Sequence, residues 1–460
     1  MKVIFISLDT LRANRLGSYG YDLPTSPYMD HIASEGVLFE NAFASDIPTE
    51  VAHTSIFTGK VGLSTGVVSH GSPSTYLSKK QDWLPTMLRK AGYTTAAVDN
   101  MYNLKEWFAR GYQYYMNSVG QTRWIDGQTV NNLAKPWIKA HKDEDFFLFL
   151  HYWDPHTPYL PTQNYISKFY DSNKDPYNPN NRSMEPALNH PTYPFFKYHH
   201  YDLLGSVTDT NYVNALYDAE IRYLDDLLKD LDDYLMAQGI KDETMLVLFG
   251  DHGENLTEHD IYWDHCGLYD NTVHIPMIIR WPGHIQEGTR VHDLVQHVDM
   301  MPTLLETMGV DQPNHIDGKS LWPLIQGKNV QHHSEIYLSE CAWQASRGIR
   351  TKRYKYIETY DSGPYTRPPY ELYDIIDDPG EEENLATMLP EQIEMYQNKL
   401  SEWVKLKVGD QEDPMQSVLK TEGLPFRKRI EKILKTYGLS WESWLANPKK
   451  ERIDFSKKYL

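Results

Sequence analysis

Two aspartates and a histidine, Asp9, Asp251 and His252, follow the ends of short apolar runs in this sequence. The runs that precede them are Lys2–Leu8 and Met245–Phe249. Carboxylates and an imidazole are suitable ligands for a divalent metal ion. An aspartate at a strand end more often caps a helix, but the joint appearance of these groups favours a metal site.

Thr49 begins a segment that predicts a short helix ending at Gly59. Threonine is a frequent N-cap residue and glycine a frequent C-terminal stop, so a capped helix is the simplest interpretation. A hydroxyl at this position also lies at the positive end of the helix dipole. If the hydroxyl contacts a divalent ion as well, it can act as a nucleophile near neutral pH.

Four histidines stand close to these segments in the sequence. His151 and His156 come directly after the apolar run Phe146–Leu150, while His259 and His265 follow the Asp-His pair. A histidine in such a position can donate a hydrogen bond to an anionic ester or protonate a leaving group. The alternative interpretation of His151 and His156 is a pair of surface-loop histidines.

The elements that must position these residues are indicated by apolar runs that alternate with helical patterns. Besides the three runs above, Thr94–Val98 ends at polar residues, and Leu84–Ala91 and Tyr217–Leu235 have helical periodicity. Continuous apolar runs between helices indicate buried parallel strands of an α/β sheet. Ligands bind at the carboxyl ends of such strands, where these Asp, Asn and His residues lie.

The pattern of apolar and polar residues changes near residue 335. Short alternating runs there predict a small antiparallel sheet, and charged helical segments follow it. We predict a catalytic domain over residues 1–335, a small-sheet subdomain over 336–410 and a helical arm over 411–460. Residues 163–205 are rich in Asn, Pro, Tyr and His without periodicity, which predicts a lid-like insertion. The arm is expected to pack on the body or to contact a second copy of the chain.

Composition narrows the class of partner. The 460 residues include 45 Lys and Arg against 63 Asp and Glu, so the formal net charge is −18. Such a chain is not expected to bind nucleic acid, which requires clustered basic residues. Two cysteines cannot build a disulfide framework. The first apolar run is too short for a signal peptide, and no apolar run is long enough to span a membrane, so we expect a cytoplasmic protein.

Taken in order, the motifs resemble the sulfatase family of the alkaline phosphatase superfamily over roughly residues 1–400. The resemblance implies a large mixed, mostly parallel sheet between helices, a smaller C-terminal antiparallel sheet, and hydrolysis of sulfate or phosphate esters at a divalent metal. It implies Asp9, Asp251 and His252 as metal ligands and Thr49 as both ligand and nucleophile. The resembling segments are 7–12, 49–60, 151–159, 249–254, 268–270, 275–283, 298–303, 317–321, 350–356 and 371–374.

The sequence departs from the usual sulfatase pattern at its nucleophile. Sulfatases carry Cys or Ser in a Cys-x-Pro-x-Arg pattern, and that residue is oxidised to formylglycine; here Thr49, Val51 and His53 occupy those places. Threonine cannot give that aldehyde. A threonine nucleophile resembles instead the phosphoryl-transfer branches: phosphodiesterases, phosphonate monoester hydrolases and phosphoglycerol transferases.

These features lead us to expect a hydrolase of phosphoesters, with a phosphodiester or phosphonate monoester favoured, that works through a phosphothreonine intermediate. One divalent ion (manganese, zinc or calcium) is expected as cofactor, and a small anionic ester as substrate. His156 or His265 would protonate the leaving oxygen. Two alternatives remain open: a sulfatase, or a catalytically inactive binding protein. The residues expected to bind substrate are His53, Asn100, His151 and His259.

Overall fold

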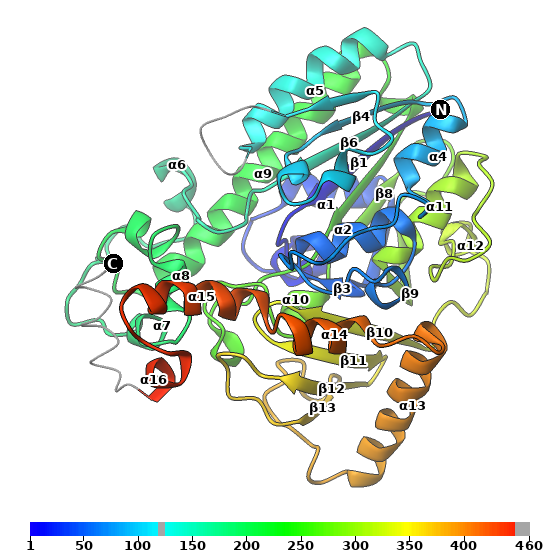
Figure 1. The fold of residues 1–460 in the computed structure, drawn as a ribbon. Helices are drawn as coiled ribbons and strands as arrows, with labels where there is room; N and C mark the ends of the chain where they lie inside the picture. Colours follow the sequence, from blue (N-terminus) through cyan, green and yellow to red (C-terminus); the bar gives the residue numbers. More distant parts are fainter. Residues whose placement is uncertain (118–124, 447–460) are drawn as a thin grey trace.

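The computed structural model describes residues 1–117 and 125–446 (Figure 1). Eight strands form a large sheet in the order β5-β4-β6-β1-β7-β8-β2-β9. Neighbouring strands run parallel except that β8 is antiparallel to both β7 and β2. The strands are β1 (Lys2–Leu8), β2 (Val37–Phe43), β4 (Thr94–Val98), β5 (Tyr114–Met116), β6 (Phe146–Tyr152), β7 (Thr244–Gly250), β8 (Met277–Arg280) and β9 (Thr289–Gln296).

Helices cover both faces of the large sheet. Every residue of the central strands β1, β6 and β7 is buried, which explains why these strands are apolar throughout. Helices α1, α5 and α9 pack together on one face, and α2, α4 and α11 pack together on the other (Figure 1). The α/β class and the mostly parallel sheet predicted from the sequence are therefore confirmed.

The smaller sheet has the order β13-β12-β11-β10-β3. Its strands β10 to β13 are antiparallel, as the alternating sequence pattern predicts, and α13 packs against them. Strand β3 comes from the N-terminal part of the chain and pairs in parallel with β10, directly before the helix that carries Thr49. The strands are β3 (Asp46–Ile47), β10 (Glu335–Cys341), β11 (Ala345–Thr351), β12 (Tyr354–Asp361) and β13 (Tyr370–Asp374).

Sixteen α-helices are described, and many of them are short. Among residues 1–117 and 125–446, no helix is long and apolar enough to cross a membrane. The helices are α1 (Pro27–Ser34), α2 (Thr49–Thr58), α3 (Gly62–Thr65), α4 (Leu84–Lys90), α5 (Gly127–His141), α6 (Gln163–Ile166), α7 (Glu185–Leu188), α8 (Tyr193–Phe196), α9 (Thr210–Gln238), α10 (Asp270–Val273), α11 (Met300–Thr307), α12 (Trp322–Ile325), α13 (Pro390–Val408), α14 (Pro414–Thr421), α15 (Pro425–Thr436) and α16 (Trp441–Ala446).

Single 3-10 turns connect several of these elements. They are η1 (Ala13–Arg15), η2 (Gly17–Tyr19), η3 (Met101–Asn103), η4 (Glu106–Ala109), η5 (Tyr201–Leu204), η6 (Lys241–Glu243), η7 (Glu258–Asp260) and η8 (His297–Asp299).

The insertion over 163–205 and the C-terminal arm lie against each other. The insertion is not without structure, because it contains α6, α7, α8 and a 3-10 turn. Helix α15 of the arm packs against α8 of the insertion (Figure 1). The described part of the arm thus packs on the body, whereas residues 447–460 of the predicted arm lie outside the described residues.

A buried ion pair joins helix α9 to strand β8. The Arg280 guanidinium donates to both carboxylate oxygens of Asp232, at 2.8 and 2.5 Å, and both side chains are almost fully buried. Removing Asp232 leaves the buried Arg280 with Glu35, at 3.3 Å, as its one carboxylate partner in the described part of the chain, so most of the compensation of its charge is lost. We therefore expect Asp232→Ala to lower the free energy of unfolding by about 3–5 kcal/mol. Urea unfolding measures this, with the exposed Asp233→Ala on the same helix as the control.

The same pair predicts a dependence of stability on pH. Burial raises the pKa of Asp232, but the hydrogen bonds and charge of Arg280 outweigh burial and hold the pKa at about 2, below its ordinary 3.8. A depressed folded-state pKa stabilises the protein above pH ~4, and this contribution is lost as the pH falls toward ~2. The stability difference between wild type and Asp232→Asn should shrink over that range; a constant difference would contradict the assignment.

Candidate active site

The ends of two neighbouring strands bring the predicted metal ligands together. Leu8 of β1 pairs in register with Gly250 of β7, so the residues that follow, Asp9 and Asp251, leave the sheet at the same level. His252 comes next in the chain. One ligand atom from each of Asp9, Asp251 and His252 lies within 4.8 Å of the other two, and all three side chains are fully buried.

Thr49 completes this group from the other side. It is the first residue of α2, and its hydroxyl Oγ1 lies 3.1 Å from His252 Nε2. The expected N-cap role is wrong in detail, because the N-cap is Pro48 and the Thr49 side chain accepts no capping hydrogen bond. The predicted stop is confirmed: Gly59 ends the helix with a left-handed backbone, φ 62°. The Thr49 hydroxyl is therefore available for chemistry.

The carboxylates of this cluster lack the donors that buried carboxylates require. Asp9 Oδ1 and Asp251 Oδ2 have no hydrogen-bond partner among the described residues. Burial raises the pKa of Asp9 to about 7, and burial together with the charge of Asp9 raises the pKa of Asp251. Two adjacent buried carboxylates with unpaired oxygens fit a divalent cation, which would offset both charges.

The backbone and a third histidine fix the orientation of the ligands. His252 Nδ1 lies 3.0 Å from the carbonyl of Gly253, so this nitrogen carries the proton and Nε2 presents its lone pair to the cluster. Asp251 Oδ1 accepts from the backbone N–H groups of Thr10 and His252. His151 Nε2 lies 3.0 Å from Asp9 Oδ2. These contacts hold the ligands in place before an ion binds.

His53 lies beneath Thr49 in the fold interior. Its Nδ1 donates to the Thr49 carbonyl at 2.9 Å, and its Nε2 lies 2.8 Å from Ser7 Oγ. Burial lowers the pKa of His53 to about 3 and that of His151 to about 4, so both rings are neutral at pH 7. Neither ring lines the pocket described below, and their expected contact with substrate stays a prediction.

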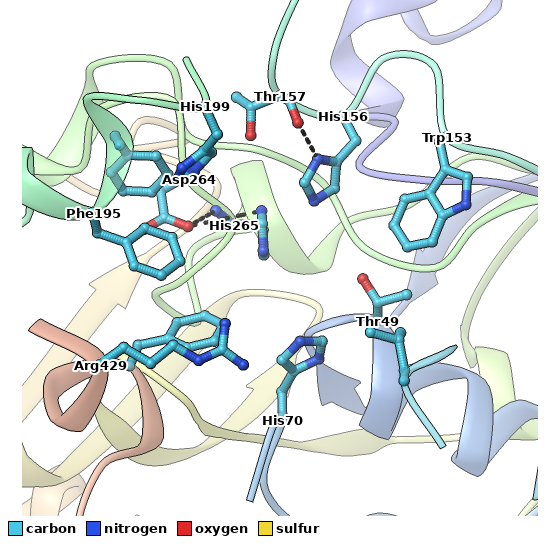
Figure 2. A pocket seen from close by; sticks show the side chains of 13 residues that line it. Thr49, His70, Trp153, His156, Thr157, Phe195, His199, Asp264, His265 and Arg429 are labelled. Atoms are coloured by element: carbon cyan, nitrogen blue, oxygen red, sulfur yellow. Dashed lines mark hydrogen bonds and ion pairs between the residues drawn. The ribbon is translucent and has the colours of Figure 1, made fainter. Parts of the chain in front are cut away.

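An open pocket begins at Thr49 (Figure 2). His156 and His265, the candidate acids, both line it, with their ring centres 5.0 Å apart. His156 Nδ1 lies 2.6 Å from the Thr157 carbonyl, which leaves Nε2 as the atom able to carry a second proton. The other residues that line the pocket are His70, Leu104, Trp153, Thr157, Phe195, Phe196, His199, Asp264, Phe426 and Arg429.

The other two residues expected to bind substrate, Asn100 and His259, also lie outside this lining. His259 stacks on Tyr269 with ring centres 3.6 Å apart, away from the pocket. Asn100 lines a neighbouring pocket, where its Oδ1 accepts from Trp153 Nε1 at 2.7 Å. The structure thus groups Thr49, His156 and His265 but does not bring His259 to them.

The insertion that the sequence predicts as a lid supplies Phe195, Phe196 and His199 to the pocket wall. The sequence did not single out His70, or Phe426 and Arg429 of α15. His70 follows α3 in a segment without a motif. Arg429 belongs to the charged helical segments predicted after the small sheet, and their pattern does not indicate where the helix packs.

A second group of possible ligands, Asp299, His332 and His333, lies elsewhere. Its carboxylate is already satisfied: the backbone N–H groups of Gln296 and Lys319 donate to the two oxygens at 2.8 and 2.7 Å. Both histidines contact the same carboxylate at 3.1 Å. Asp299 belongs to a capping box on the 3-10 turn η8, whereas the carboxylates of the Asp9 cluster keep unpaired oxygens.

Comparison with known proteins places the chain in a family. The sequence model of the Sulfatase family matches residues 2–310, and that of the C-terminal region of N-sulphoglucosamine sulphohydrolase matches residues 257–407. The chain therefore belongs to the sulfatase family, as the ordered motifs predicted. Enzymes of this family generally use a divalent metal ion, in agreement with the cluster around Asp9.

Similar curated proteins are sulfatases. An ulvan-active sulfatase of Formosa agariphila is 26% identical over 84% of this chain and 76% of its own length. An N-acetylglucosamine-6-O-sulfatase of Bacteroides thetaiotaomicron is 24% identical over 83% and 82% of the two chains. Arylsulfatase K of Xenopus laevis is 24% identical over 82% and 77%.

Solved structures show the same fold. A protein in complex with its substrate D-glucosamine-2-N,6-O-disulfate has a TM-score of 0.72 at 20% identity, covering 90% of this chain and 99% of that one. The phosphonate monoester hydrolase of Agrobacterium radiobacter has a TM-score of 0.71 at 21% identity, covering 88% and 96%. At these identities the likeness concerns the fold.

These relatives overturn the expected preference for phosphoesters. The named curated relatives act on sulfate groups, whereas the phosphonate hydrolase resembles the chain in fold alone. The error lay in the argument from Thr49. A threonine lacks the second hydroxyl that lets formylglycine expel sulfate by elimination, but water can still attack the sulfur atom directly. Threonine at this position removes one route of sulfate release and does not exclude sulfuryl transfer.

Proposed function

We propose that this chain is a metal-dependent hydrolase of sulfuric esters of sugars. The observation that carries the proposal is the pair of buried carboxylates, Asp9 and Asp251, beside the Thr49 hydroxyl. A sulfate monoester carries one negative charge and a phosphate monoester carries nearly two at neutral pH. Close to two carboxylates, the singly charged sulfate ester meets less repulsion than a phosphate monoester does. Phosphodiesters and phosphonate monoesters carry the same single charge, and the preference for sulfate over them rests on the named sulfatase relatives. The sulfated sugars on which the similar proteins act supply the substrate class.

Asp9, Asp251 and His252 would hold the ion, with Thr49 Oγ1 adjacent to them. A divalent ion bound there supplies positive charge that stabilises an alkoxide and the oxygens of the ester. Manganese, zinc and calcium all suit a set of carboxylate oxygens and one imidazole nitrogen. The same proposal includes the stoichiometry of one divalent ion per chain.

The reaction then proceeds in two displacements at sulfur. The Thr49 hydroxyl loses its proton to solvent, and Oγ1 forms a bond to sulfur. The bond from sulfur to the sugar oxygen breaks, its electron pair stays on that oxygen, and a proton from His156 or His265 neutralises it. Water next attacks the same sulfur atom, releases sulfate and restores the Thr49 hydroxyl.

A substrate panel tests the choice of sulfur over phosphorus. We expect kcat/KM for p-nitrophenyl sulfate to exceed that for p-nitrophenyl phosphate, bis-p-nitrophenyl phosphate and p-nitrophenyl phenylphosphonate by at least ~10²-fold, about 2.7 kcal/mol of transition-state stabilisation. The assays use one metal and one pH. A phosphodiester or phosphonate as the best substrate would sink the proposal, and no turnover of any ester would favour a binding protein.

The leaving-group role of the two histidines predicts a selective loss. Replacing the acting acid, His156 or His265, by alanine should slow hydrolysis of sugar sulfates about 10²–10⁴-fold. p-Nitrophenyl sulfate should lose much less, because p-nitrophenolate leaves without protonation. The measurement compares the loss of kcat/KM on both substrates for each variant. Equal losses on both substrates in both variants would leave these histidines with a binding role only.

A further inference from the structure

Helix α15 carries the one lysine or arginine that lines the described part of the active-site pocket, Arg429. The helix is anchored by Phe426, Ile430 and Leu434, which are buried. The Phe426 ring lies 5.5 Å from the ring of Phe195 in the insertion and 5.1 Å from that of Trp343. The arm is therefore held against the pocket by apolar contacts that do not involve the charge of Arg429.

The guanidinium of Arg429 lies between an aromatic ring and a stretch of backbone. It lies over the Phe426 ring, 4.7 Å from the ring centre. A Cβ atom at Gly71 would come within 2.8 Å of one of its nitrogens, so the guanidinium lies close to the backbone at Gly71. Figure 2 shows Arg429 across the pocket from Thr49, with His70 between them in this view.

This cation has no carboxylate partner among the described residues. Two buried arginines of the chain each have a carboxylate partner: Arg280 pairs with Asp232, and Arg347 pairs with Asp413. The carboxylate that acts on Arg429 is Glu50, which is already held by the Gly71 N–H at 2.8 Å and by Lys105 at 3.6 Å. Burial lowers the pKa of Arg429 below its ordinary value. An anion in the pocket would offset this cost of burial.

The active-site pocket shares part of its wall with a second pocket. His70, Leu104, Trp153 and Arg429 line both, and the second pocket adds Lys105. Thr49 and Arg429 line the same first pocket. A sugar whose ester lies at Thr49 would place its other substituents toward Arg429.

We propose that Arg429 binds a second anionic group, a carboxylate or another sulfate, on the sugar that carries the scissile ester. This inference rests on the proposed function and narrows its substrate class to sulfated sugars with a second acidic group. The guanidinium fork matches both kinds of oxyanion. The C-terminal arm, which lies beyond the family match over 257–407, would thereby determine specificity.

The test compares binding of matched sugars by calorimetry, on a Thr49→Ala background with metal present. The pairs are glucuronic acid 2-sulfate with glucose 2-sulfate, and D-glucosamine-2-N,6-O-disulfate with N-acetylglucosamine 6-sulfate. We expect the dianion of at least one pair to bind about 10–100-fold more tightly, as for a charge-assisted hydrogen bond. The pair that shows the preference distinguishes a carboxylate from a second sulfate.

In the same background, Arg429→Gln should reduce this preference to about twofold or less, and Arg429→Lys should keep part of it. Arg427→Gln is the matched control on α15, because Arg427 pairs with Glu431 and lies outside the pocket lining; it should keep the full preference. A preference that survives in Arg429→Gln, or none in any pair, overturns the inference. Should wild type hydrolyse no sulfate ester while the preference still depends on Arg429, the proposed function fails alone.

Discussion

Replacing Thr49 by alanine is expected to abolish hydrolysis of p-nitrophenyl sulfate, with a loss of about 10⁴-fold or more in kcat. Losses of this size follow removal of a nucleophile whose partners depend on it. The hydroxyl lies 3.1 Å from Nε2 of His252, one of the three candidate metal ligands. Alanine removes the atom that forms the bond to sulfur.

The fold should survive this change. Thr49 makes no capping hydrogen bond, so its removal costs less than the roughly 1 kcal/mol of a lost N-cap. Thr49→Ser retains the hydroxyl and should retain measurable turnover, whereas Thr49→Val keeps the side-chain shape and should be as inactive as alanine. Thermal unfolding and initial rates are measured on all three variants. Full activity in Thr49→Ala would show that water attacks sulfur without a covalent intermediate.

The sequence predicted the part of this site that depends on local order. Polar residues at the ends of buried runs located Asp9 and Asp251, because strand ends of a parallel sheet meet at one edge. The boundaries of β1 and β4 also agree with the apolar runs. In contrast, β2 and β9 were missed, since Val37–Phe43 and Thr289–Gln296 contain polar residues where they become partly exposed.

Residues that reach the site through tertiary packing were not predictable in this way. Arg429 enters the pocket because α15 packs on α8, and neither helix indicates its partner by periodicity. His259 shows the converse: its closeness in sequence to the Asp-His pair suggested a site residue, but its ring stacks on Tyr269. His265 is further from the pair in sequence and does line the pocket, so closeness in sequence does not decide which histidine reaches the site.

Removing the metal is expected to abolish activity. Asp251→Asn should abolish it as well, and added metal should not restore activity to this variant. The change exchanges a carboxylate for a neutral amide with one acceptor oxygen. Elemental analysis should find about one ion per wild-type chain and far less in Asp251→Asn. His333→Ala, in the satisfied group around Asp299, should keep its ion and its activity. An ion retained by Asp251→Asn but lost from His333→Ala would place the metal at the second group.

The unfolding temperature provides an independent test that the metal binds at Asp9, Asp251 and His252. An ion that binds only the folded state stabilises it, by about 4 kcal/mol at a thousandfold excess over Kd, so chelation should lower the unfolding temperature of wild type. Without the ion, Asp9 and Asp251 are adjacent carboxylates with unpaired oxygens in a buried site. Asp251→Asn removes one of the two like charges, so the chelated variant should unfold at or above the temperature of chelated wild type. A metal-free variant clearly less stable than metal-free wild type would mean that the hydrogen bonds of Asp251 to the N–H groups of Thr10 and His252 outweigh its repulsion from Asp9.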